Sequence, residues 1–131
     1  MERLIIQSSK RIELIDITSR IMEKINGKIK DGVVICYNPH TTAGLLINEH
    51  ADIDVAFDIE NFLSKIVPHN NNFAHSEGNS DAHIKSVLTG NSLSLILENG
   101  RIQLGRWQGI FFAEYDGPRT REIWIKILKE N

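Results

Sequence analysis

The sequence has a single cysteine, Cys36, and no segment that is long and apolar enough to span a membrane. One thiol cannot form an intrachain disulfide, and this favours a reducing, cytoplasmic location. The first residues, MERLIIQSSKRIELIDI, lack the continuous apolar region of a secretory signal, and a membrane helix needs about 20 apolar residues. We therefore expect a soluble cytoplasmic protein without a membrane partner.

An excess of charge of one sign is also lacking. The chain has 15 Lys and Arg against 17 Asp and Glu, a formal net charge of -2. Such a balance creates no general field that would attract nucleic acid, so we expect no nucleic-acid partner and a ligand that is recognised locally. A length of 131 residues, 41% of them hydrophobic, is suited to one core, which predicts a single domain over residues 1–131.

Short β-rich segments alternate with helical patterns along the chain. Strands are expected at residues 3–7, 11–16, 33–38, 43–48, 93–98, 101–104, 107–115 and 121–128. The dipeptide Asn99-Gly100 is typical of a type I′ hairpin turn. The pattern predicts an α+β fold with about seven or eight strands and two or three helices.

Two helices are expected in the first half of the chain. The first follows Asp16 or Thr18 as N-cap, and its apolar face comprises Ile21, Met22, Ile25 and Ile29. The second follows Asp52 or Asp54 and ends before Pro68, and its apolar face comprises Val55, Ile59, Phe62, Leu63 and Ile66.

A short third helix is expected to begin near Ser80 and to stop at Gly90. Its apolar residues Ile84, Val87 and Leu88 are expected to face the core.

Polar residues in "NPHTTAGLLINE" interrupt two predicted strands. Pro39 restricts the backbone beside His40, which would hold the imidazole in one direction, and the hydroxyls of Thr41 and Thr42 can donate to an anion. Glu49 lies at the far end of the second strand. The alternative is that both threonines are ordinary strand residues and that His40 belongs to a turn.

The stretch "HSEGNSDAH", residues 75–83, contains little that a core can use. His75 and His83, with Glu77 and Asp81, are suitable ligands for a divalent metal, although their spacing matches no established motif. The helix start at this point also favours an anion. The alternative is that Asp81 caps the helix and that both imidazoles are exposed to solvent.

In "EYDGPRTRE", Arg119 and Arg121 follow a tight turn. Residues two apart in a strand face the same way, so both guanidiniums can bind one phosphate. The alternative is a set of surface ion pairs with Glu114, Asp116 or Glu122, which would stabilise the protein little. The other histidines, His50 and His69, are interpreted as surface or capping residues.

The stretches "PHTTAGLLINE", "HSEGNSDAHIKSVLTGNS" and "NGRIQLGRWQGIFFAEYDGPRTRE" occur in the order and spacing of the YjbQ-like family, also called the secondary thiamine-phosphate synthase family. The resemblance covers residues 2 to 128. It implies a β-sandwich that assembles as a homotrimer, with pockets shared between subunits. It also implies a weak transferase activity that joins a pyrimidine diphosphate and a thiazole phosphate into thiamine phosphate.

The resemblance places a group of residues in the pocket: His40, Thr41, Thr42, Glu49, His75, Asn79, His83, Arg119 and Arg121. On this basis Thr41, Thr42, Asn79 and the two arginines are expected to bind a phosphorylated metabolite, and His40, His75 and His83 a divalent metal such as zinc or magnesium. His83, Glu49 and Asp81 are the candidate catalytic residues. Arg106 departs from the family pattern, which has a small residue there.

Two other functions are compatible with the same residues. One is binding of a phosphorylated metabolite or a metal without catalysis. The other is a metal-dependent hydrolase in which the imidazoles help to activate water. The sequence does not discriminate between these functions and the transferase.

Overall fold

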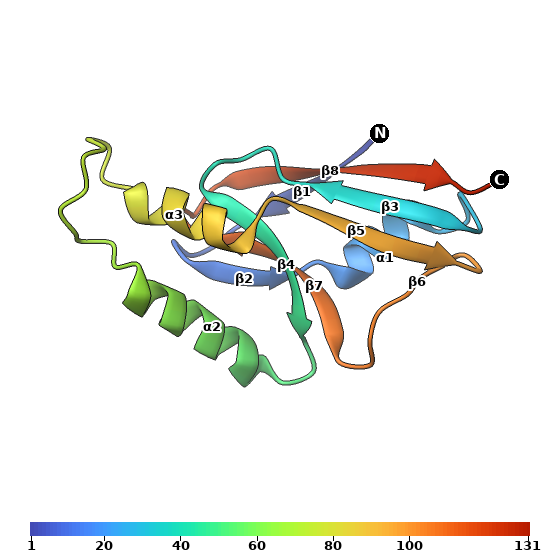
Figure 1. Cartoon of the computed structure of the whole chain (residues 1–131), viewed down its shortest axis with the longest axis horizontal. Helices are drawn as coiled ribbons and strands as arrows, with labels where there is room; N and C mark the ends of the chain where they lie inside the picture. Colours follow the sequence, from blue (N-terminus) through green and yellow to red (C-terminus); the bar gives the residue numbers. More distant parts are fainter.

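The computed structural model describes residues 1–131 as two antiparallel β-sheets and three helices (Figure 1). The five-stranded sheet has the order β1-β8-β3-β5-β6, and its strands are β1 (Glu2–Gln7), β8 (Thr120–Lys129), β3 (Gly32–Tyr37), β5 (Ser92–Glu98) and β6 (Arg101–Ile102). The three-stranded sheet comprises β2 (Glu13–Asp16), β7 (Gln108–Glu114) and β4 (Ala43–Glu49). This architecture confirms the predicted α+β sandwich.

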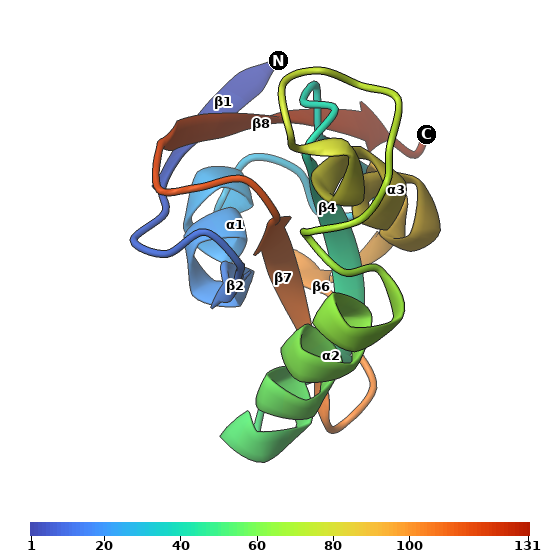
Figure 2. The ribbon, with the colours of Figure 1, turned by 90° about the vertical axis from the view of Figure 1, so that its left-hand side faces the viewer.

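The main core lies between the two sheets. Inward positions alternate along each strand of the larger sheet, as in Ile123 and Ile125 of β8, and they meet Leu45, Ile110 and Phe112 of the smaller sheet. β7 is buried on both faces from Gly109 onward, because helices cover the side of the smaller sheet that faces away from the core (Figure 2).

The first helix, α1 (Thr18–Ile25), buries Ile21 and Ile25 as predicted, whereas Met22 is 39% exposed. The predicted N-cap, Asp16 or Thr18, is wrong, because the N-cap is Ile17, which makes no side-chain cap hydrogen bond. Asp16 lies one residue earlier, and its Oδ1 accepts a hydrogen bond from the Thr18 backbone N–H at 3.0 Å. The hairpin prediction is also confirmed, since Asn99 and Gly100 both have positive φ (53° and 76°) between β5 and β6.

The helix α2 (Ile53–Ile66) begins after Asp52, whose Oδ1 accepts from the Asp54 N–H at 2.9 Å. The predicted apolar face is only partly buried: Leu63 packs beside the smaller sheet, but Phe62 and Ile66 are exposed. The reason is that α2 lies along the outer edge of the smaller sheet, next to β2, and contacts little else (Figures 1 and 2). None of the three helices is long and apolar enough to cross a membrane.

The helix α3 (Ser80–Thr89) begins and ends where expected, but the predicted inward face is wrong. Ile84, Val87 and Leu88 are exposed. The buried residues are instead Asp81, Ala82, Lys85 and Ser86. Hydrophobic periodicity fails here because α3 packs on β4 through small and charged side chains, which satisfy one another in the interior.

Three connections meet at one end of the sandwich (Figures 1 and 2). They are the β3–β4 loop (residues 38–42), the α2–α3 connection (residues 67–79) and the β7–β8 turn (residues 115–119). Each contains one of the polar stretches that stand out in the sequence. The fold therefore brings together three segments that are far apart along the chain.

Candidate functional site

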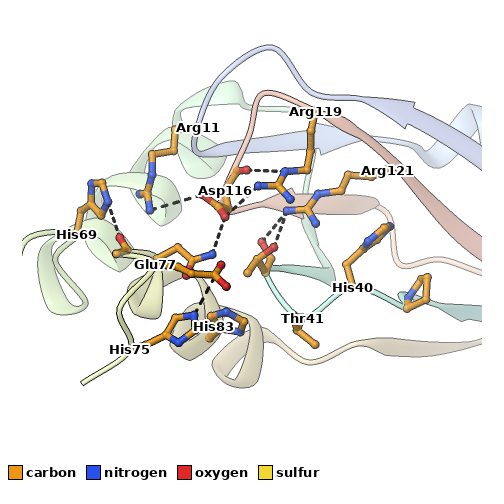
Figure 3. A pocket seen from close by; sticks show the side chains of 14 residues that line it. Arg11, His40, Thr41, His69, His75, Glu77, His83, Asp116, Arg119 and Arg121 are labelled. Carbon is orange, nitrogen blue, oxygen red and sulfur yellow. Dashed lines mark hydrogen bonds and ion pairs between the residues drawn. The ribbon is translucent and has the colours of Figure 1, made fainter. Parts of the chain in front are cut away.

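A cavity of about 760 Å³ opens at this end of the sandwich, and no hydrophobic residue lines it. Figure 3 shows its lining: Arg11, Pro39, His40, Thr41, Thr42, His69, His75, Glu77, Gly78, Asn79, His83, Asp116, Arg119 and Arg121. A pocket this polar is suited to a charged, hydrated ligand rather than an apolar one.

The β3–β4 loop is held by Asn38, which is 1% exposed. The Asn38 amide donates to the carbonyl oxygens of Ala43 (2.8 Å) and His40 (3.2 Å), and its Oδ1 accepts from the His40 N–H at 3.0 Å. These bonds satisfy the loop backbone and fix the positions of His40, Thr41 and Thr42.

Arg121 is the most deeply buried cation of the lining, at 4% exposure. Its Nε donates to Glu114 Oε1 at 2.9 Å, and its Nη2 donates to the hydroxyl (2.8 Å) and carbonyl oxygen (3.1 Å) of Thr42. Its Nη1 donates to no group of the protein. The guanidinium is therefore held from behind and keeps one N–H₂ group for a ligand.

Glu114 is fully buried and accepts from three other groups besides the guanidinium's Nε. The Ser8 hydroxyl donates to its Oε1 at 2.7 Å, and the Asp116 N–H and Arg121 Nη2 donate to its Oε2. Burial raises the pKa of Glu114, but the hydrogen bonds from Arg121, Asp116 and Ser8 outweigh burial, so the net shift is downward. The carboxylate is thus ionised and fixes the cation beside it.

The other two arginines are also held by acidic residues, Arg119 through Nε and Nη2 as in Arg121, and Arg11 through both Nη groups. Arg119 donates through Nε to the Asp116 carbonyl oxygen (2.9 Å) and through Nη2 to Asp116 Oδ2 (3.0 Å). Arg11 makes a bidentate pair with Asp81, with bonds of 3.0 and 2.9 Å. Three arginines, each with its own carboxylate, therefore surround the cavity. Preorganised guanidiniums of this kind recognise phosphate or carboxylate oxygens.

His40 is tied to the neighbouring strand. Its Nε2 lies 3.0 Å from the backbone nitrogen and 3.1 Å from the carbonyl oxygen of Glu122, which leaves Nδ1 as the free ring nitrogen. Burial and then the positive charge of Arg121 lower the pKa of His40. His40 is thus a neutral imidazole at physiological pH.

His75 and His83 form an edge-to-face pair with ring centroids 5.4 Å apart, and His75 Nε2 lies 3.8 Å from Glu77 Oε2. No group of three or more His, Cys, Asp or Glu side chains is close enough to hold a metal. The three predicted imidazole ligands line one cavity, but His40 Nε2 is engaged by Glu122. The residues in this arrangement do not fit a three-histidine metal site.

All five predicted ligand-binding residues line the cavity: Thr41, Thr42, Asn79, Arg119 and Arg121. Asn79 is held by Asp116, since its Nδ2 donates to Asp116 Oδ2 at 2.9 Å. Two predicted catalytic carboxylates are not in the lining. Asp81 is fully buried behind Arg11, and Glu49 lies at the opposite end of β4, where it accepts from the Asp52 N–H at 3.0 Å.

Sequence reasoning missed several residues of the site. One of them is Arg11, which lines the cavity but lies in a segment that is otherwise an ordinary strand pattern. His69 is exposed, as the surface interpretation expected, but it also lines the cavity, and its Nε2 lies 3.0 Å from the Gly78 carbonyl oxygen. Arg106 stacks on Trp107, with 4.9 Å from its guanidinium carbon to the ring centroid, and does not reach the cavity.

Comparison with known proteins shows close relatives over nearly the whole chain. The family model described as "UPF0047 protein YjbQ-like" matches residues 2–130. UPF0047 protein MJ1081 of Methanocaldococcus jannaschii is 57% identical over 94% of this chain and 90% of its own. UPF0047 protein YugU of Bacillus subtilis is 45% identical, over 98% of both chains.

Solved structures show the same fold. A YjbQ/UPF0047 family protein from Clostridium acetobutylicum superposes with a TM-score of 0.95 and 43% identity, over 98% of this chain and 100% of that one. The conserved protein TT1486 from Thermus thermophilus gives a TM-score of 0.92 and 42% identity with the same coverage.

Proposed function

The chain belongs to the YjbQ-like UPF0047 family, and we propose that its pocket binds small phosphorylated metabolites and transfers a group between two of them with loss of pyrophosphate. One observation carries the proposal: Arg11, Arg119 and Arg121 line a single cavity, and each is oriented by its own carboxylate. A site that bound a neutral ligand would have no need for three oriented guanidiniums.

Thiamine-phosphate synthesis is the reaction that we propose to test first, because the sequence resemblance implies it. In that reaction the thiazole ring nitrogen attacks the methylene carbon of the pyrimidine diphosphate. The new C–N bond forms as the C–O bond to pyrophosphate breaks, and pyrophosphate leaves with the electron pair. Negative charge accumulates on the leaving group, and positioned guanidiniums stabilise such charge.

The chain's residues take different parts in this proposal. Arg119 and Arg121 bind the pyrophosphate through their free Nη1 groups, and Thr41 and Asn79 help to orient the substrates. His83 contacts the leaving group as a hydrogen-bond donor or acid. Asp81 acts from behind Arg11, because it is buried and has no surface to present to a ligand.

His83→Ala is the variant that tests the proposal. We expect it to lower the rate of thiamine-phosphate formation by about 10²-fold or more, as for the loss of a general acid, while circular dichroism remains unchanged. His50→Ala is the matched control, because His50 pairs with Asp16 and does not line the pocket. Unchanged turnover in His83→Ala would remove this histidine from the reaction.

The main alternative to an enzyme is a protein that binds a phosphorylated metabolite without catalysis. It predicts saturable binding of a phosphorylated compound with no product when both precursors are present. A hydrolase would release phosphate from one precursor alone, whereas the transferase requires both. Assays with each precursor separately and then together distinguish the three functions.

A divalent metal, zinc or magnesium, remains a proposal of its own. The His75–His83 pair is the observation that favours it, since two imidazoles in contact can provide part of a coordination shell. A phosphorylated ligand would have to complete that shell, because no third protein ligand is close. Elemental analysis of purified protein, repeated on the His75→Ala and His83→Ala double variant, tests this point.

We also propose that the protein is a homotrimer, as the resemblance implies. Val33, Ile96 and Leu128 are exposed on the outer face of the larger sheet, and Val33 is directly paired with both of the others in the strand register. A continuous exposed row of this kind is typical of an interface.

A further inference from the structure

The buried face of α3 contains two opposite charges. Asp81 and Lys85 are both fully buried, and Lys85 Nζ donates to Asp81 Oδ2 at 3.0 Å. A lysine with no exposed surface is uncommon in proteins, and it requires a charged partner to offset the loss of hydration. Lys85 is not in the lining of the pocket, so the proposed function gives it no direct role.

Asp81 is shared between two cations. Its Oδ2 accepts from both Arg11 Nη1 and Lys85 Nζ, and its Oδ1 accepts from Arg11 Nη2. Burial raises the pKa of Asp81, but the hydrogen bonds from Arg11 and Lys85 outweigh burial and bring it to about 2. The carboxylate is therefore ionised, and the group of three side chains has a net charge of +1.

The other arginines of the pocket have no such surplus. Arg121 is neutralised by Glu114. Arg119 is neutralised by Asp116, whose second oxygen also lies 4.0 Å from Arg11 Nη2, so the three cations Arg11, Lys85 and Arg119 share two carboxylates. Glu77 also lines the cavity, but its side chain is 71% exposed, so solvent screens its charge. Among these arginine and lysine side chains, the positive charge that no carboxylate matches therefore comes from Lys85, which lies outside the pocket lining.

We infer that Lys85 is the positioning residue that makes this pocket select dianionic phosphate groups over monoanionic ones. The charge acts through Asp81: because Asp81 is shared with Lys85, it neutralises Arg11 only in part, and Arg11 keeps attraction for a phosphate. This inference rests on the proposed function, since it assumes that the pocket binds phosphorylated ligands.

The dependence on ligand charge gives the inference a quantitative signature. Coulomb energy is proportional to the charge of the ligand, so the loss of one fixed positive charge costs a dianion twice the binding free energy that it costs a monoanion. The dissociation constant of the dianion therefore rises by the square of the factor for the monoanion. We expect a factor of about three for a monoanion and about ten for a dianion. A distorted pocket would weaken both without this relation.

The experiment compares two probes by NMR titration at about pH 8, where histidines are neutral and a phosphate monoester is a dianion. The probes are methyl phosphate, a dianion, and dimethyl phosphate, a monoanion. The variants are Lys85→Met, which is apolar, and Lys85→Gln, which keeps a hydrogen-bond donor for Asp81. Lys65→Met is the matched control, since Lys65 is exposed, lies outside the pocket lining and loses the same charge.

Both Lys85 variants should lose selectivity for methyl phosphate to the same extent, although they differ in hydrogen bonding, and Lys65→Met should keep it. If the wild-type protein binds the probes and the Lys85 variants keep the same selectivity, the role of Lys85 is overturned and the anion site is not. Wild-type protein that binds neither probe would overturn the anion site and this inference together. If Lys85→Met does not fold, Lys85→Gln, which leaves Asp81 with both partners, decides the outcome.

Discussion

Each arginine of the pocket is paired with a carboxylate, and these pairs have consequences for stability as well as for binding. Arg121 and Glu114 are both nearly inaccessible to solvent, at 4% and 0% exposure. Neither could remain charged in the interior without the other, because an isolated buried charge loses its hydration without compensation. The stability of this end of the sandwich therefore depends on a few charged side chains.

Glu114→Gln should destabilise the protein by about 3 kcal/mol or more, because Arg121 would be left buried beside a neutral partner. Urea denaturation measures the effect, with the exposed Glu98→Gln as control. The double variant Glu114→Gln with Arg121→Met should recover a large part of the loss, since it leaves no unpaired charge. Equal losses in Glu114→Gln and Glu98→Gln would contradict the pairing.

Asp81 predicts an acid-dependent loss of stability. Its folded pKa of about 2 lies below the ordinary value of 3.8, so its stabilising contribution is complete above about pH 4 and is lost as the pH falls towards 2. The two values correspond to about 2 kcal/mol. Denaturation measured across this range should show a smaller fall for Asp81→Asn than for wild type. A fall of the same size in both proteins would show that Asp81 has no such shift.

At the scale of the elements, α3 is the helix whose position matters most for the site. Its C-terminal end lies against β4, where the Leu45 N–H donates to the Gly90 carbonyl oxygen at 3.1 Å. Gly44 permits this approach, since a Cβ there would lie 2.3 Å from Thr89 Oγ1. The close contact explains why the buried face of α3 includes the small residues Ala82 and Ser86.

The orientation of α3 predicts that a substitution on its buried face lowers the free energy of unfolding, whereas one on its exposed face changes it little. Ala82→Leu should destabilise the protein by about 1–3 kcal/mol through overpacking, because Ala82 is fully buried against Ala113 and Tyr115. Val87→Gln should change the free energy of unfolding by less than about 0.5 kcal/mol in the monomer, because Val87 is 82% exposed. Urea denaturation of both variants measures this, and a larger loss in Val87→Gln would mean that the opposite face is buried.

At the scale of the whole molecule, exposed apolar residues lie mainly on three surfaces. They are the outer face of the larger sheet (Val33, Ile96 and Leu128), the outer side of α2 (Ile53 and Phe57) and the outer face of α3 (Val87 and Leu88). The row on the sheet is continuous across three strands, whereas α2 contacts the rest of the chain at one edge. We therefore assign the proposed subunit contact to the sheet.

Ile96→Lys should shift the protein from the mass of three chains towards that of one chain of 14.9 kDa, because a charge would have to be buried in the contact. Ile53→Lys is the control on α2 and should leave the assembly intact. Sedimentation velocity measures both. A monomeric wild-type protein, or dissociation only in Ile53→Lys, would contradict the assignment.

Local sequence rules were sufficient for much of the fold. The strand segments, the Asn99-Gly100 turn, the Asp52 cap and the ends of α3 were all predicted, because each depends on residues within a few positions of one another. The polar loops at residues 38–42, 75–83 and 116–121 were also recognisable as a candidate site. Their composition indicates that they contribute little to the hydrophobic core, in which Ala82 alone of these residues takes part.

Only the tertiary structure decided which residues of those loops act together. It paired Arg11 with Asp81 across 70 positions and Arg121 with Thr42 across 79, and it turned the charged side of α3 inward. Sequence patterns missed these features because burial of a charge depends on a partner that the fold, and not the neighbouring sequence, brings into contact. Glu49 is separated from the pocket for a different reason: it is the last residue of β4, and an extended strand carries its two termini to opposite ends of the sheet.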